Sequence, residues 1–346
     1  MSKVRAQGER VRKFILEQVA RHPTDIAKVA AEQFGTTRQA IGKHLTRLVG
    51  EGALIHSGKT RAKSYSLCEV QKWEKVYRHD TMLAEDIVWR EDIAPVLGSL
   101  PENVRRIWEH GFTEIFNNAI DHSNARATTV SVTKTAADTE IVVVDNGVGI
   151  FEKIQKALNL LDVRHAVLEL AKGKLTTDPD NHTGEGIFFS SRMFDHFQIL
   201  ASHTYFSHKY DDEEDWVLES KGTAPGTAVF MKLNNHTART TQQVFSAFES
   251  EDYAFTKTVV PVHLAQYGDD KLISRSQAKR LLQRVDRFRT VMFDFAEVTG
   301  IGQAFADEIF RVFAASHPGI EIIAIRANEQ VTGLINRARR TGEPVP

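Results

Sequence analysis

Apolar residues recur at helical spacing between residues 104 and 122. At 3.6 residues per turn, one face of such a helix would be apolar and would pack against a core. That face comprises Trp108, Phe112, Ile115, Phe116 and Ala119. The opposite stripe carries Glu114, Asn118 and Asp121. The segment therefore predicts an amphipathic helix that presents two carboxylates and an amide on its polar side.

A strand is predicted next, over residues 140–145. Its apolar run has the β-branched composition of a buried strand, and it ends at Asp145 in a turn that contains Gly147 and Gly149. Because glycine has no side chain, the backbone at such positions can approach a neighbour or a ligand closely. The pattern thus places the Asp145 carboxylate, a hydrogen-bond acceptor, beside backbone that a ligand can approach closely.

A helical segment and a polar loop are predicted after the turn. Residues 151–171 have helical periodicity, and residues 173–182 are polar and typical of a loop. Gly184 and Gly186 then open a helix that runs to residue 194, and the N–H groups at a helix start can bind phosphate. Further strands are predicted at residues 196–203, 216–220 and 227–233, the last directly after Gly226.

Residues 1–68 are predicted to form a separate N-terminal domain. Thr24 and Thr36 are the expected N-caps, and Gly35 and Gly50 the expected ends, of its second and third helices. The predicted helices span residues 7–21, 24–34 and 37–50, and the predicted strands residues 53–57 and 63–67. This order, with a short turn between the second and third helices, resembles a winged helix-turn-helix. The resemblance implies double-stranded DNA as a partner.

The charge distribution favours a nucleic-acid contact at this end. Residues 1–66 contain 13 Lys and Arg against 5 acidic residues, a formal charge of +8, whereas the whole chain carries −1. The third helix would enter the major groove, and the loop between the strands would meet phosphates. The candidate DNA-binding residues are Thr37, Arg38, Gln39, Lys43, Arg47, Lys59, Arg61 and Lys63. The alternative is a winged helix that binds protein through a basic, solvated surface.

Residues 69–103 are predicted to be a charged helical connector. Its apolar positions include Trp73, Val76 and Tyr77, which stand at helical spacing. The connector would join the N-terminal domain to the segment that carries the stripe and the glycine turn, residues 104–240.

The motifs of residues 104–240 together resemble the nucleotide site of the GHKL ATPases, the superfamily of DNA gyrase B subunits, heat-shock chaperone ATPases and histidine kinases. Their Glu-x-x-x-Asn helix is matched by Glu114 and Asn118, and their Asp-x-Gly-x-Gly turn by Asp145, Gly147 and Gly149. The later elements are matched, in family order, by Gly184, Gly186 and Thr227. The resemblance implies that the segment between Phe151 and Thr183 forms a lid over the nucleotide. The resemblance implies an α/β sandwich with a mixed sheet, and ATP and Mg²⁺ as cofactors.

The resemblance also implies a role for each matched side chain. Asn118 would be the Mg²⁺ ligand, because this cation takes oxygen ligands and keeps several waters. Glu114 would be the catalytic residue that orients and deprotonates the attacking water or hydroxyl. Asp145 would accept from the adenine amino group, with Asp121 on the adenine side of the pocket. The remaining candidates would approach the base or the phosphates, and they are Gly147, Gly149, Gly184, Gly186 and Thr227.

Residues 245–346 are predicted to form a small α/β domain. The strands are expected at residues 291–295 and 320–325, and the helices at residues 304–315 and 331–340. The run from Asp294 to Ala306 resembles a STAS domain, the fold of anti-anti-sigma factors, whose partners include GHKL anti-sigma kinases. In that family a serine at the helix start is phosphorylated, but this chain has Gly302, Gln303 and Ala304 there, and Thr299 is the nearest hydroxyl. The resemblance therefore favours a domain that docks a protein partner or forms a homodimer, with a plain packing domain as the alternative.

The fold class expected is thus multidomain, with an α+β winged helix, a GHKL α/β sandwich and a STAS-like α/β domain. A single cysteine, Cys68, excludes a disulfide framework, and no apolar run reaches the ~18 residues of a membrane span. A cytoplasmic location is expected. The expected function is an ATP-binding, ATP-hydrolysing transcriptional regulator that binds DNA and changes domain arrangement or dimerisation with nucleotide state. The alternative is a serine/threonine kinase of the anti-sigma type that acts on a separate protein.

Overall fold

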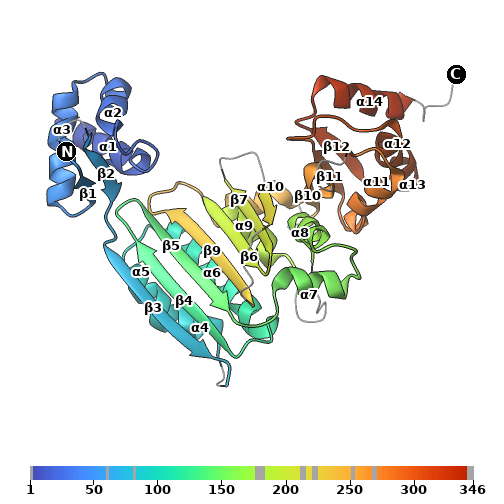
Figure 1. Ribbon diagram of the computed structural model, residues 1–346, viewed down its shortest axis with the longest axis horizontal. Coiled ribbons are helices and arrows are strands. Elements are labelled where there is room, and N and C mark those ends of the chain that lie inside the picture. The colour runs from blue at the N-terminus through green and yellow to red at the C-terminus, as the bar shows by residue number, and fades with distance from the viewer. Residues whose placement is uncertain are drawn as a thin grey trace.

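Three β-sheets, each with its own strand order, organise the chain (Figure 1). The computed structural model describes residues 3–59, 62–80, 83–175, 184–210, 216–219, 225–250, 254–266 and 271–340. Within these residues the sheets have two, seven and three strands. They belong to an N-terminal, a central and a C-terminal part, so the chain is a multidomain α/β protein.

The N-terminal part packs three helices beside a two-stranded antiparallel sheet. Its elements are α1 (Lys3–Gln18), α2 (Ile26–Phe34), α3 (Arg38–Gly50), β1 (Leu54–Ser57) and β2 (Ser64–Leu67). They enclose a core of their own, with Ile15, Ile41 and Leu45 at most 1% exposed. Gly35 ends α2 with a φ of 59°, a backbone conformation that favours glycine. The order and type of these elements are as predicted.

Two predicted helix caps are wrong by one residue. The caps of α2 and α3 are Asp25 and Thr37, where Thr24 and Thr36 are expected. Thr36 belongs to the end of α2, because its N–H donates to a carbonyl of that helix. The Thr37 hydroxyl instead accepts from the Ala40 N–H at 3.2 Å and caps α3.

The central part contains the seven-stranded sheet, in the order β3-β4-β5-β9-β6-β7-β8. Its strands are β3 (Gln71–Arg78), β4 (Ala127–Lys134), β5 (Asp138–Asp145), β6 (His196–Ala201), β7 (Thr204–Lys209), β8 (Trp216–Glu219) and β9 (Thr227–Asn234). A mixed sheet is expected here, but all the described pairings are antiparallel, because short connections join β4 to β5 and β6 to β7. Parallel pairing lies in the C-terminal sheet, so strand direction is mixed only across the whole molecule.

Strand β3 overturns the first half of the predicted helical connector. It pairs with β4 along its whole length and forms one edge of the sheet. Trp73, Val76 and Tyr77 stand at helical spacing only by coincidence, because Trp73, Lys75 and Tyr77 share one face of the strand. Lys75 lies between Trp73 and Tyr77 on this face, and its charge is paired because its ammonium donates to Asp92 at 2.6 Å. The second half of the connector is helical, as α4 (Glu85–Val88), a π-helical turn η2 (Trp89–Ile93) and α5 (Ala94–Leu97).

Helices cover one face of the central sheet, and in Figure 1 α6 (Glu102–Asp121) lies behind it. Alternate residues of β4 and β5 are buried toward this layer, including Val130, Val132 and Ile141. Trp108 and Phe112 of α6 are fully buried, as the apolar face of the predicted helix requires. The other helices of the central part are α7 (Ile150–Ala157), α8 (Val163–Lys172), α9 (Gly186–Met193) and α10 (Thr241–Phe248).

The C-terminal part is built on a parallel sheet in the order β10-β11-β12. Its strands are β10 (Lys257–Pro261), β11 (Thr290–Asp294) and β12 (Glu321–Ile325). Its helical segments are η3 (Val262–Ala265), α11 (Arg275–Leu281), η4 (Val285–Arg287), α12 (Gln303–Asp307), η5 (Glu308–Phe313), α13 (Ala314–Ser316) and α14 (Glu329–Arg340). The predicted helix at residues 304–315 corresponds to the continuous run from α12 to α13.

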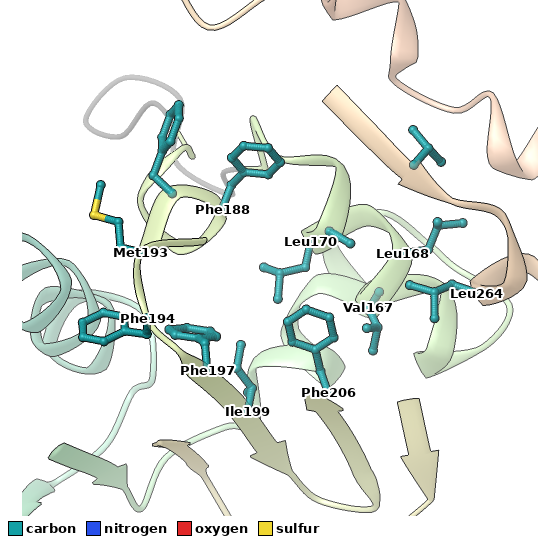
Figure 2. Packing of buried hydrophobic residues seen from close by; sticks show 14 of the residues in the cluster. Val167, Leu168, Leu170, Phe188, Met193, Phe194, Phe197, Ile199, Phe206 and Leu264 are labelled. Carbon is teal, nitrogen blue, oxygen red and sulfur yellow. The ribbon is translucent and has the colours of Figure 1, made fainter. Parts of the chain in front are cut away.

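The central and C-terminal parts share one hydrophobic core. Figure 2 shows Val167 and Leu170 of α8 beside Phe206 of β7, while Leu168 lies toward Leu264 of η3. Helix α8 is therefore the main link between the two parts, and a boundary drawn near residue 240 divides a packed unit. None of the helices in the described part of the chain is both long and apolar enough to cross a membrane.

Candidate functional site

One cavity collects most of the nucleotide-site residues that the sequence predicts. It has a volume of about 290 Å³ and lies between α6, the end of β5, the start of α9 and the start of β9. The predicted residues that line it are Glu114, Asn118, Asp145, Gly184, Gly186 and Thr227. They span more than a hundred positions of sequence, so the fold brings together what the chain separates. Apolar side chains such as Val143 and Ile187 complete the walls.

The polar stripe of α6 contributes two of its three members to the cavity. Glu114 and Asn118 line it, whereas Asp121 is exposed and lies outside the lining. The Asn118 side-chain nitrogen donates to the Glu114 carbonyl at 2.7 Å, one helical turn earlier. With the nitrogen engaged, the Asn118 Oδ1 atom remains as the acceptor or metal ligand of this amide.

The Glu114 carboxylate lies against the backbone of Gly186. A Cβ atom at Gly186 would come within 1.8 Å of Glu114 Oε2. No side chain fits at position 186 unless the carboxylate moves. Glu114 of α6 and Gly186 in the first turn of α9 are therefore in contact and form one corner of the cavity. The sequence motifs alone do not indicate this contact.

Asp145 is held in place by hydrogen bonds from two directions. Its Oδ1 accepts from the Gly147 N–H at 2.8 Å, and Thr227 also donates to the carboxylate. The Thr227 hydroxyl accepts in turn from the Ile150 N–H at 3.1 Å. Burial raises the pKa of Asp145, since Asp145 is only 4% exposed, and these hydrogen bonds act in the opposite direction. The cavity thus contains a positioned, largely dehydrated carboxyl group.

The glycines around Asp145 are needed first for packing within the protein. A Cβ atom at Gly147 would lie 2.0 Å from the Ser123 carbonyl oxygen, and one at Gly226 would lie 2.0 Å from that of Asp145. Gly226 also has a φ of 89°, in the region that favours glycine. Gly149 caps α7, and neither Gly147 nor Gly149 lines the cavity. The predicted approach of these two glycines to a ligand stays a prediction.

Gly184 fixes the loop that precedes α9. It has a φ of 71°, and its carbonyl accepts from the Leu175 N–H at 3.0 Å. A Cβ atom there would collide with the Leu175 backbone. Residues 176–183, which include most of the predicted lid loop and Thr183, lie outside the described residues. Leu175 and Gly184 therefore meet beside the cavity.

Four polar residues line the cavity without having been singled out in the sequence: Asn117, His122, Ser123 and Lys153. Lys153 Nζ donates to the His122 carbonyl at 2.5 Å, close to the end of α6. Burial lowers the pKa of Lys153. Its position, four residues after Gly149 and so one turn into the helix that the glycine opens, was the only local signal for it.

The predicted DNA-binding residues lie on α3 and the β1–β2 hairpin. Thr37, Arg38, Gln39, Lys43 and Arg47 are all exposed on α3. Arg47 pairs with Glu51 at 2.6 Å, and the Thr37 hydroxyl is engaged as the cap. On the hairpin, Lys59 is exposed and Lys63 lies over the Tyr65 ring, whereas Arg61 lies outside the described residues.

The C-terminal part has a recognisable family signature. Residues 277–332 match the family described as a STAS-like domain of unknown function (DUF4325). The match runs from α11 into α14 and confirms the STAS-like prediction for these residues. No curated protein matches the chain significantly.

The STAS-like domain begins its helix α12 without room for a phosphoacceptor. Gly302 caps this helix, and a Cβ atom there would lie 2.7 Å from the Ile273 Cα atom. Gln303 and Ala304 follow, and Thr299, whose hydroxyl is the nearest one before them in the sequence, is exposed on the preceding loop. A serine at position 302 would therefore require the Ile273 backbone to move.

Proposed function

We propose that the central cavity binds ATP with Mg²⁺ and that the chain is an ATP-hydrolysing, DNA-binding regulator. The observation that carries this proposal is the convergence of Glu114, Asn118 and Asp145 on one cavity. The same residues carry the resemblance to the GHKL ATPases. A half-enclosed cavity with apolar walls and a few directed polar groups is the usual form of a small-molecule site.

The residues present fit a magnesium nucleotide chemically. Asn118 offers an amide oxygen, the type of ligand that Mg²⁺ accepts beside its waters and phosphate oxygens. When bound, the metal would neutralise charge on the phosphates. Glu114 lines the same cavity one helical turn before Asn118 and would orient the attacking water and accept its proton. The first N–H groups of α9, at Gly186 and Ile187, would donate to the phosphates.

Asp145 would select the base. A buried carboxylate held by the Gly147 N–H and Thr227 can accept from the amino group of adenine. A keto oxygen at the same place, as in guanine, would face the carboxylate without a proton between them. Because the site is largely dehydrated, this difference in hydrogen bonding favours adenine over guanine nucleotides.

The N-terminal part is connected to the cavity through the strand that ends at Asp145. In the hairpin between β4 and β5, Ala136 packs against the N-terminal core. The backbone carbonyl of Lys134 accepts from the Val70 N–H at 2.8 Å. Strand β5 runs from this hairpin to Asp145. We therefore propose that nucleotide occupancy shifts the N-terminal part, a winged helix that addresses DNA through α3.

The adenine contact can be tested with Asp145→Asn. The substitution keeps an oxygen for the Gly147 N–H but presents an amide N–H to the adenine amino group, so we expect affinity for ATP to fall by about tenfold to a hundredfold. Because burial raises the pKa of Asp145, its ionised form lowers folding stability above that pKa, and the neutral amide should leave the melting temperature equal or higher. Calorimetric titration and thermal melting measure both. Unchanged affinity would contradict the adenine contact.

The DNA contact can be tested on α3. Arg38→Ala should weaken binding to duplex DNA by about tenfold or more, because it removes an exposed cation at the helix start. Lys43→Ala should also lower the slope of log affinity against log salt by about one. Lys13→Ala is the matched control, since Lys13 is exposed on α1 and pairs with Glu17. Anisotropy with a labelled random-sequence duplex provides the measurement, and equal binding by all variants would favour a protein-binding winged helix.

A further inference from the structure

The last two turns of helix α8 are enclosed on every side. Each residue from Ala166 to Lys172 is at most 5% exposed. A helix without an exposed stripe must be covered by different neighbours on its different faces. In Figure 2, Val167 and Leu170 point toward strands of the central sheet, and Leu168 lies toward Leu264 of the C-terminal part. Both parts therefore hold this helix.

A buried charge cluster joins the last turn of α8 to the STAS-like domain. The side chains of Glu169 and Lys172 are 2% and 1% exposed, and Lys172 Nζ lies 2.6 Å from Glu169 Oε1. The other oxygen, Glu169 Oε2, accepts from Arg284 Nη1 at 2.9 Å. Arg284 also donates to the Lys174 carbonyl, just beyond the helix. Because Arg284 lies within residues 277–332, the STAS-like domain contacts both α8 and the backbone that follows it.

Further hydrogen bonds reinforce the same junction. Lys172 Nζ donates to the Gln283 carbonyl at 2.9 Å, and the Thr258 hydroxyl donates to the Lys172 carbonyl at 2.6 Å. Lys174 Nζ lies 5.0 Å from the centre of the Phe288 ring. Buried charges are costly unless they are paired, so these contacts favour one position of α8 against the C-terminal part.

The fixed segment is also a wall of the central cavity. Leu170 of α8 and Leu175, three residues after Lys172, both line the cavity. The Leu175 N–H donates in turn to the carbonyl of Gly184, two residues before α9 begins. A shift of α8 relative to the central sheet would therefore change the shape of the cavity directly.

We infer that the STAS-like domain clamps α8 over the nucleotide cavity through the Glu169–Lys172–Arg284 cluster, and that loosening this clamp lets bound nucleotide leave faster. The inference rests on the proposed binding of ATP at that cavity. The two states are a clamped α8 with a closed wall and a released α8 with an open one. The C-terminal part thus regulates the site in cis.

Arg284→Met in the full chain tests the clamp. The substitution leaves the Glu169–Lys172 pair electrically balanced, so the fold should be retained while the contact from the STAS-like domain is lost. We expect a fluorescent ATP analogue, preloaded with Mg²⁺ and chased with excess ATP, to dissociate about tenfold faster than from the parent. The amides of α8 should also exchange faster with deuterium in the nucleotide-free protein, while those of α6 keep the parental rate.

Two further variants make the result specific. Arg284→Lys keeps the charge but cannot reach both Glu169 and the Lys174 carbonyl, so its dissociation rate should lie between those of the parent and Arg284→Met. Arg275→Met is the matched control, because Arg275 is exposed on α11 and pairs only loosely, with Asp307 at 3.9 Å and Glu308 at 4.0 Å. A parent that binds the analogue, with an equal dissociation rate in Arg284→Met, would overturn the clamp alone. A parent that binds no analogue would overturn the proposed function, and the clamp with it.

Discussion

Glu114→Gln should reduce the rate of ATP hydrolysis by about a thousandfold while ATP still binds with nearly the parental affinity. The amide has the shape of the carboxylate and can still lie against Gly186, but it cannot accept a proton from water. Single-turnover hydrolysis of labelled ATP measures the chemical step, and calorimetry measures the affinity. A loss confined to the rate separates catalysis from binding.

The control for this variant is Glu109→Gln on the same helix. The Glu109 side chain is about half exposed and lies 3.9 Å from Arg105, outside the cavity lining. It should hydrolyse ATP at the parental rate. Equal hydrolysis by the parent and Glu114→Gln would remove Glu114 from the chemistry. Label that appears on protein instead of free phosphate would favour the kinase alternative.

Gly186→Ala should reduce hydrolysis by about a hundredfold without unfolding the protein. The added Cβ atom would lie 1.8 Å from Glu114 Oε2, so the carboxylate must move aside. A displacement of about 1 Å in a catalytic group is enough for a loss of this size. Because the clash involves the end of a flexible side chain, the melting temperature should stay close to that of the parent.

Gly333→Ala is the matched control for Gly186→Ala. Gly333 lies in α14, and an added Cβ atom there has no neighbour within 4 Å. It should leave hydrolysis unchanged and slightly favour the helix. If Gly186→Ala hydrolyses ATP like Gly333→Ala, the joint corner of Glu114 and α9 has no role in turnover.

Local patterns predicted the parts of the site that lie within one element. The stripe of α6 follows from helical pitch, and Asp145 follows from an apolar strand that ends in a glycine turn. The STAS-like region was recognised from the residues around Asp294 and Gly302, and the family match confirms it for residues 277–332. These features could be predicted because they depend on residues that are close together in the sequence.

The features that depend on distant contacts were missed. Strand β3 resembled a helix because its apolar residues fall at helical spacing, and only its pairing with β4 decides the structure. Strand β10 and helix α11 were not foreseen, although they complete the C-terminal part. The pairing of Glu169 with Arg284 joins residues 115 positions apart, and no local pattern announces it. From sequence alone, charged residues such as Glu169 and Arg284 are expected on a solvent-exposed face, and only the folded structure shows that they are largely buried.

The most direct test of the nucleotide site is a crystal structure of the full chain with Mg²⁺ and a non-hydrolysable ATP analogue. The proposed site predicts the adenine amino group within hydrogen-bonding distance of the Asp145 carboxylate, and Mg²⁺ coordinated by Asn118 Oδ1 beside the Glu114 carboxylate. An analogue bound elsewhere, or a central cavity that stays free of nucleotide at saturating concentration, would contradict it.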